Sequence, residues 1–210
     1  LGRAAAVSSG TAGLHLALLA LGIGPGDRVI IPSYVCTALL NAVCHAGAEP
    51  VLADIDPDTF NIDPKDAGRR VTSRTRAMIV PHLFGLAADM DGLMALDIPL
   101  IEDCAQAVGA QYHGKPLGGF GYAGVFSFYA TKVMTTGEGG LVASRNEEFI
   151  ERILDLREYD NQPDYRVRYN YKMSDLQAAM GLVQVQKLEA FIKRRREIAG
   201  RYTQALRPFS

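Results

Sequence analysis

The chain has 210 residues, of which 48% are hydrophobic and 21% are charged, and its formal net charge is −1. This composition supplies enough apolar residues for one large domain or two small ones, and it excludes a disordered chain. A charge so close to zero gives no general attraction to nucleic acid or to an anionic membrane, so we expect neither as a partner.

The number and spacing of cysteine and histidine residues indicate whether disulfides or a metal site are to be expected. Cys36, Cys44 and Cys104 are an odd number without paired spacing, which favours a reduced, cytoplasmic protein over a disulfide framework. Neither a CxxC nor an HxxxH pattern occurs, so we expect no metal. The apolar stretch 12–23 is too short to span a bilayer.

Predicted strands and helices alternate along the first half of the chain. Helical patterns occupy 12–21, 35–46, 64–70 and 89–96, and apolar runs predict strands at 28–32, 50–55, 77–81 and 99–103. Short apolar strands that alternate with helices indicate an α/β fold of three layers, α/β/α, with a mostly parallel central sheet. The carboxyl ends of such strands meet along one edge, where ligands bind, and Tyr34 and Asp103 follow two of these ends.

The pattern changes after Asp103. We expect a hairpin within 108–117, strands at 124–129 and 141–144, a helix at 147–157, and one long helix from Ser174 to about Leu206. These elements divide the chain into a large domain at 1–172, which we expect to be incomplete at its start, and a long helix at 173–210.

Two common nucleotide-binding patterns are excluded. Gly119, Gly121 and Gly124 form a G-x-G-x-x-G, but a strand follows it where the dinucleotide fingerprint requires a helix. Neither a G-x-x-x-x-G-K-[ST] phosphate loop nor a G-x-S-x-G nucleophile elbow occurs.

Three separated features each have an ordinary explanation when taken alone. Ser9-Gly10-Thr11 precedes a helix, where free N–H groups attract anions, although a plain N-cap explains it better. Asp103 ends an apolar strand, where it either meets a positive partner or caps the next helix. Lys132 follows a strand, and a lysine in a loop is usually solvated.

Together the three features match the needs of pyridoxal phosphate (PLP). This cofactor requires a lysine amine for a Schiff base, a carboxylate that keeps its ring nitrogen protonated, and a phosphate cradle. Lys132, Asp103 and the helix start at Gly10 supply the three, and Ser127 would add a hydroxyl group to the phosphate.

Several segments resemble the DegT/DnrJ/EryC1/StrS sugar aminotransferase family. The most specific are Asp-x-Ala-Gln-Ala at 103–107, Ser-Phe-x-x-x-Lys at 127–132 and Gly-Glu-Gly-Gly at 137–140. The resemblance covers essentially the whole chain and implies the large domain of fold type I PLP enzymes, with the C-terminal small domain mostly absent. It also implies a homodimer with shared active sites.

The resemblance assigns a role to each matching residue. Lys132 would form the Schiff base and move protons, and Asp103 would pair with the ring nitrogen. The other expected cofactor contacts are the ring hydroxyl (Gln106), the phosphate (Gly10, Thr11 and Ser127), ring stacking (Tyr34) and the phosphate of the partner's cofactor (Asn170). We expect His82 to have a structural or loop-shaping role, with substrate contact as the alternative. We expect Glu138 to fix its loop and Cys104 to be core.

The implied reaction moves an amino group from glutamate or glutamine, through the pyridoxamine form of the cofactor (PMP), to a keto sugar. A nucleotide-linked 4-keto-6-deoxy or 3-keto hexose is the expected acceptor. Two alternatives remain. One is a dehydratase of the same family, although such relatives carry histidine where this chain has Lys132. The other is a PLP-binding fragment without catalysis.

Overall fold

The computed structural model describes residues 2–160 and 162–209, and its centre is a seven-stranded sheet in the order β1-β9-β8-β5-β4-β2-β3. Within it, β9 runs antiparallel to both of its neighbours, and the remaining pairs are parallel. The predicted mostly parallel sheet is therefore confirmed. The strands are β1 (Arg3–Val7), β2 (Arg28–Pro32), β3 (Glu49–Ala53), β4 (Thr75–Pro81), β5 (Leu100–Asp103), β8 (Ala123–Ser127) and β9 (Gly140–Ser144).

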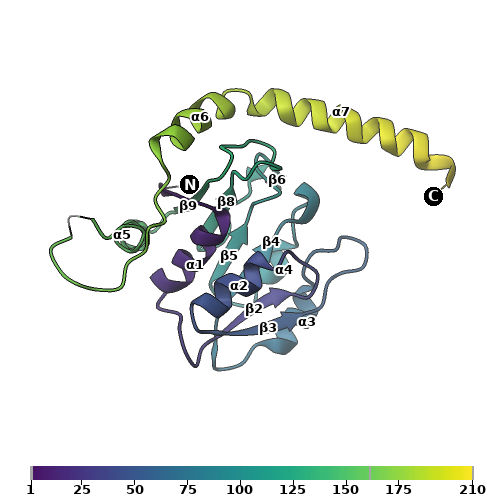
Figure 1. Cartoon of the computed structure of the whole chain (residues 1–210). Coiled ribbons are helices and arrows are strands. Elements are labelled where there is room, and N and C mark those ends of the chain that lie inside the picture. Colours follow the sequence, from purple (N-terminus) through teal and green to yellow (C-terminus); the bar gives the residue numbers. More distant parts are fainter. Residues whose placement is uncertain (1, 161, 210) are drawn as a thin grey trace.

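Helices cover both faces of the sheet, which confirms the three layers (Figure 1). On one face lie α1 (Gly10–Ala20), α2 (Ala38–His45) and α5 (Glu147–Leu156), and their apolar residues form the larger core cluster with the sheet. On the other face lie α3 (Pro64–Arg70) and α4 (Met90–Met94), over a smaller cluster. Strands that are covered on both faces must be apolar throughout, and the last five residues of β4 are all buried.

Small elements connect this framework. A 3₁₀ turn, η1 (Leu83–Gly85), follows β4, and the predicted hairpin is formed by β6 (Gln111–Tyr112) and β7 (Lys115–Pro116). The sequence did not predict β1, an alanine-rich strand at the edge of the sheet. It is a strand because it pairs over its whole length with β9, from Arg3 opposite Ser144 to Val7 opposite Gly140.

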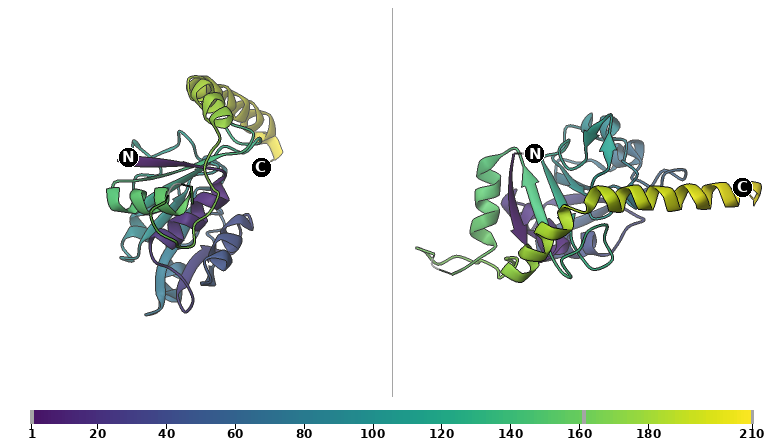
Figure 2. Two further views of the ribbon diagram at one scale, coloured as in Figure 1. Left: turned by 60° about the vertical axis from the view of Figure 1, so that its left-hand side comes forward. Right: turned by 90° about the horizontal axis from the view of Figure 1, so that it is seen from above.

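The predicted helix from Ser174 to Leu206 is two helices. These are α6 (Asp175–Val185), which starts with a capping box formed by Ser174 and Gln177, and α7 (Leu188–Leu206), followed by the short η2 (Arg207–Phe209). Neither α6 nor α7 has a buried residue, and α7 extends beyond the compact part of the chain (Figure 2).

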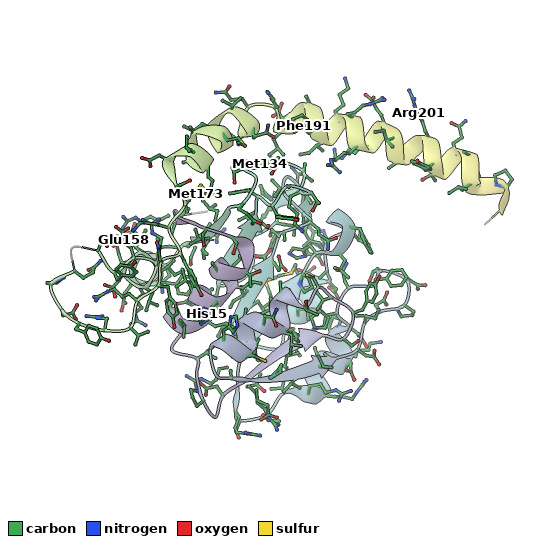
Figure 3. All side chains as sticks on the ribbon, viewed as in Figure 1. His15, Met134, Glu158, Met173, Phe191 and Arg201 are labelled. Atoms are coloured by element: carbon green, nitrogen blue, oxygen red, sulfur yellow. The ribbon has the colours of Figure 1, made fainter. Side chains whose placement is uncertain are left out.

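An apolar groove separates α6 from the end of the sheet. Met134 and Met173 lie in it, between α6 and the strands (Figure 3), and Phe126, Phe128 and Leu182 complete its walls. Within the described part of the chain, no helix combines the length and the apolar character needed to cross a bilayer.

Candidate functional site

A cavity of about 280 Å³ lies where the parallel strands end. The turns that follow β2, β4, β5 and β8 form its walls together with the N-terminus of α1. Six of the eight residues predicted from the sequence line it: Gly10, Thr11, Asp103, Gln106, Ser127 and Lys132. The cavity lies at the carboxyl ends of the parallel strands, where ligands bind in such sheets, and Asp103, which was predicted on that ground, lines it.

The first turn of α1 provides one wall. Ser9 caps this turn, since its hydroxyl oxygen accepts a hydrogen bond from the Ala12 N–H at 3.0 Å. Gly10 lies so close to β8 that an added Cβ would stand 2.8 Å from the Cβ of Ser127. The Ser127 hydroxyl group is thus held beside the positive end of a helix dipole, an arrangement that suits an anion.

Asp103 contributes a carboxyl group that is only 9% exposed. One of its oxygens accepts a hydrogen bond from the Ala105 N–H at 2.9 Å. Burial raises the pKa of the Asp103 carboxyl above its ordinary value, against the opposing effects of this hydrogen bond and of the positive charge of Lys132. A carboxylate in this position is costly unless a cation faces it, so the site suits a cationic ligand group next to Asp103.

Lys132 lies in the loop that joins β8 to β9. Within the loop the Lys132 N–H donates to the Tyr129 carbonyl at 3.0 Å, and Phe128 exchanges backbone hydrogen bonds with Thr136 and Gly139 at 2.9 Å each. These bonds fix the path of the loop on both sides of the lysine. The side chain lines the cavity, close enough to Asp103 for their charges to interact.

Tyr34 does not line the cavity. Its side chain is 52% exposed, and its ring lies 5.8 Å from the ring of Phe60. The helix predicted from Val35 begins only at Ala38, so the residues after β2 stay outside the helix and bring Val35 and Cys36 to the cavity instead.

Asn170 also lies outside the cavity, with its side chain exposed. Its neighbours Tyr169 and Tyr171 stack on each other, and both rings pack edge-on against His15 of α1. The backbone of this segment is fixed by the Ser8 N–H, which donates to the Tyr171 carbonyl at 2.6 Å. Asn170 is therefore presented to solvent from an anchored segment.

Gln106 and Glu138 complete the polar lining. The Gln106 side-chain oxygen accepts a hydrogen bond from the Phe84 N–H at 2.9 Å, which leaves the amide nitrogen as its free donor. Glu138 is exposed at the cavity, and its backbone carbonyl accepts a hydrogen bond from the Thr136 hydroxyl at 2.6 Å. That bond ties Glu138 to the loop.

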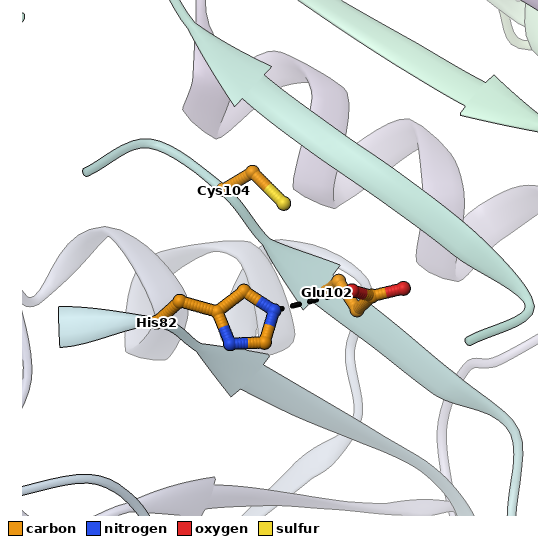
Figure 4. A group of neighbouring side chains, drawn as sticks. All are labelled: His82, Glu102 and Cys104. Atoms are coloured by element: carbon orange, nitrogen blue, oxygen red, sulfur yellow. Dashed lines mark hydrogen bonds and ion pairs between the residues drawn. The ribbon is translucent and has the colours of Figure 1, made fainter. Parts of the chain in front are cut away.

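His82, which lines the cavity, forms a buried group with Glu102 and Cys104 (Figure 4). The two oxygens of Glu102 accept hydrogen bonds from the backbone N–H groups of Gly118, Phe120 and Gly121, and one of them lies 3.2 Å from His82 Nε2. This network occupies the carboxylate, so the group is not arranged to bind a metal. Cys104 is buried in the core, as the sequence predicted, and the sequence did not single out Glu102.

A mostly parallel α/β sheet gathers a lysine, a buried carboxylate and a helix N-terminus around one cavity, an arrangement that suits a ligand with an anionic group at one end and a cationic group near Asp103. The chain belongs to the DegT/DnrJ/EryC1/StrS aminotransferase family, which it matches over residues 2–210. The family expected from the sequence motifs is thereby confirmed.

Individual relatives are similar along nearly the whole chain. GDP-perosamine synthase from Caulobacter vibrioides is 41% identical over 97% of the chain. The structure of S. venezuelae DesV in complex with a ketimine intermediate is 38% identical and superposes over 97% of the chain with a TM-score of 0.92. NtdA from Bacillus subtilis with bound cofactor PMP is 32% identical over 98%, with a TM-score of 0.89. The chain spans 57% of the first two relatives and 49% of the third.

Proposed function

We propose that the protein is a PLP-dependent aminotransferase that moves an amino group from glutamate or glutamine to a keto sugar. The observation that carries this proposal is the meeting of Lys132, Asp103 and the N-terminus of α1 in one cavity. Membership of the aminotransferase family supports it, as does the PMP bound to NtdA.

The cavity fits PLP on its own geometry. The close approach of Gly10 to Ser127 forms a phosphate cradle, because no side chain separates the hydroxyl group from the helix N-terminus. Thr11 adds a further donor there. A protonated ring nitrogen would give the buried carboxylate of Asp103 a directly facing cation, in addition to the more distant charge of Lys132. The free amide donor of Gln106 suits the ring hydroxyl group.

The chain's own residues then share the work of the reaction. When bound, PLP supplies an aldehyde that takes up the amino group and a ring that withdraws electrons. Lys132 Nζ would hold the cofactor covalently, and its free amine would move a proton to and from the substrate carbon as general acid and base. Asp103 keeps the ring nitrogen protonated and so maintains the electron withdrawal.

The acceptor, the partner and the location belong to the same proposal. A nucleotide-linked 4-keto-6-deoxy or 3-keto hexose is supported by the name of the similar GDP-perosamine synthase. A homodimer is supported by Asn170, which faces solvent from an anchored segment as a contact to a partner's cofactor requires. Tyr34 would need to turn from Phe60 to stack on the ring.

We further propose a cytoplasmic location, supported by three free cysteines, and a large domain at 1–172 followed by a helical part at 173–210.

The test is to locate the covalent link. The chain is incubated with PLP, reduced with borohydride and analysed by peptide mass spectrometry. We expect the cofactor on Lys132, and Lys132→Ala should remove both the link and amino transfer. Lys115→Ala, at an exposed position on β7, is the matched control and should change neither. Attachment at another residue would show the assignment to be wrong.

The same material separates the alternatives. A chain that binds PLP at Lys132 turns yellow, and glutamate bleaches the colour when amino transfer takes place. Colour that glutamate does not bleach would indicate binding without catalysis. Loss of water from a keto sugar, in place of amine transfer to it, would indicate a dehydratase.

A further inference from the structure

The carboxylate of Glu102, on β5, connects the end of β4 with the segment that leads into β8. Its side chain is 0% exposed. It accepts hydrogen bonds from Gly118 at 2.7 Å, Phe120 at 2.8 Å and Gly121 at 2.7 Å, in the segment that leads into β8. Its fourth partner is His82, directly after β4. Glu102 itself belongs to β5, so one carboxylate joins β4, β5 and the segment before β8.

Four donors keep this buried group ionised. Burial alone would raise the pKa of Glu102, but the hydrogen bond from His82 and those from Gly121 and Gly118 outweigh it and hold the pKa below the ordinary value. A carboxylate is the one side chain of this size with two acceptor oxygens and no donor.

The hydrogen bonds of His82 define the tautomer of its ring. The Ala88 N–H donates to His82 Nδ1 at 3.2 Å, so Nδ1 must carry a lone pair. The ring proton is therefore on Nε2, which donates to Glu102 at 3.2 Å (Figure 4). In addition, the His82 backbone N–H donates to the Asp103 carbonyl at 3.2 Å. His82 thus links Glu102 to the turn at 82–88 and to the end of β5.

We propose that Glu102, acting through the Nε2–H tautomer of His82, is a positioning residue that holds Asp103 against the cofactor ring. This inference rests on the function proposed above. Glu102 and Asp103 are neighbours on β5, and the bonds of Glu102 fix the backbone on both sides of the strand end. A neutral His82 leaves the charge of Asp103 to be matched by the ring nitrogen, whereas an imidazolium would compete with that nitrogen.

The tautomer is tested first, on the unaltered chain without ligand. Nitrogen NMR of a chain labelled at histidine should show His82 with a protonated Nε2 and an unprotonated Nδ1, and the signal that disappears in His82→Gln assigns the residue. A doubly protonated ring, or a proton on Nδ1, overturns the inference.

Four variants then test the positioning role, with PLP as the probe. Glu102→Gln offers one acceptor oxygen to four donors, and His82→Leu removes the link altogether. His82→Gln keeps an amide donor toward Glu102 and an acceptor toward Ala88 but cannot be protonated. Asp66→Asn removes a buried carboxylate on α3, outside the cavity, and controls for a general loss of stability.

We expect Glu102→Gln and His82→Leu to bind PLP about tenfold more weakly, the scale of one lost buried hydrogen bond. With nitrogen-labelled PLP, both should also lose part of the ring-nitrogen protonation. His82→Gln and Asp66→Asn should stay within about threefold of the unaltered chain and keep the protonated nitrogen.

Each outcome of these measurements either supports or overturns the positioning role of Glu102. If Glu102→Gln and His82→Leu bind PLP normally with a protonated ring nitrogen, the inference is wrong and the proposed function stands. If His82→Gln behaves like His82→Leu, a charged imidazole is required and the inference is again wrong. If the unaltered chain forms no PLP complex, the proposed function fails and the inference with it.

Discussion

The contact between Gly10 and Ser127 gives a prediction whose size follows from the structure. An alanine at position 10 would place its Cβ 2.8 Å from the Cβ of Ser127 and 3.3 Å from its hydroxyl oxygen. Carbon atoms pack at about 3.5–4.0 Å, so α1 and β8 must move apart. Overpacking of this kind lowers the free energy of unfolding by about 1–3 kcal/mol, and the higher helix propensity of alanine offsets up to about 1 kcal/mol of that loss. We therefore expect Gly10→Ala to lower the free energy of unfolding by up to about 3 kcal/mol, with about 1–2 kcal/mol in the middle of that range.

The double variant tests the cause. Ser127→Gly alone should cost about 1 kcal/mol as a glycine within a strand, but it removes the atom that the new Cβ at position 10 would meet. The two changes together should then cost less than the sum of the single changes, by about 1 kcal/mol. Gly24→Ala is the control, because the nearest atom to its added Cβ is the Ala46 carbonyl oxygen at 3.8 Å. It should be neutral or slightly stabilising.

Urea unfolding, followed by circular dichroism, gives the free energy of unfolding of all four variants. The same dependence of this free energy on urea concentration is used for each of them. PLP affinity is measured in parallel, and Gly10→Ala should lose it because the phosphate cradle has been widened. Strictly additive costs in the cycle would refute the reasoning, since they would show that the Cβ atoms at positions 10 and 127 do not interact.

Three further predictions concern ionisable groups. Asp103→Asn should raise the urea midpoint of the ligand-free chain near pH 7, because the raised pKa of Asp103 shows that its ionised form opposes folding, and it should weaken PLP binding. A lower midpoint would contradict this. Burial, and secondly the charge of His45, lower the pKa of His15, so stability should fall as the pH drops below about 6.5. His15→Leu should flatten that part of a thermal-denaturation profile, and an unchanged slope would count against it. The pKa of Asp66 is lowered to about 2, chiefly by the hydrogen bond from the Asp54 N–H. The stabilisation that ionised Asp66 gives the folded state is complete above the pKa of 3.8 in the unfolded chain, and it is lost as the pH falls toward 2. Asp66→Asn should therefore remove this dependence of the urea midpoint on acidic pH.

The sheet was predictable because its central strands are nearly continuous apolar runs between turn signals, and the strand at Arg28–Pro32 has the predicted bounds. The edge strand β1 was not. Alanine has a low strand propensity, and the residues that make Arg3–Val7 a strand lie more than 130 positions away in β9. No local pattern carries that information.

The site shows the same division between local and distant information. Asp103, Ser127 and Lys132 could be predicted because each follows or ends a recognisable strand. Cys36 lines the cavity but was not singled out, because the apolar pattern places it inside the predicted helix, which in the structure begins only at Ala38.

Glu102 left a signal that could have been used. An acidic side chain within an apolar strand must find donors, and alternation along the strand directs it away from Asp103. The sequence could not say that these donors are backbone N–H groups at 118–121, because only the folded chain brings them to the strand.

The pairing of β1 with β9 has a consequence for biosynthesis. Gly10 is synthesised before residues 140–144, which pair with the strand that precedes its helix, and before Tyr171, which accepts the hydrogen bond from the Ser8 N–H. Contacts so distant along the chain form late. The N-terminus of α1 therefore reaches its final position only after Tyr171 has been synthesised.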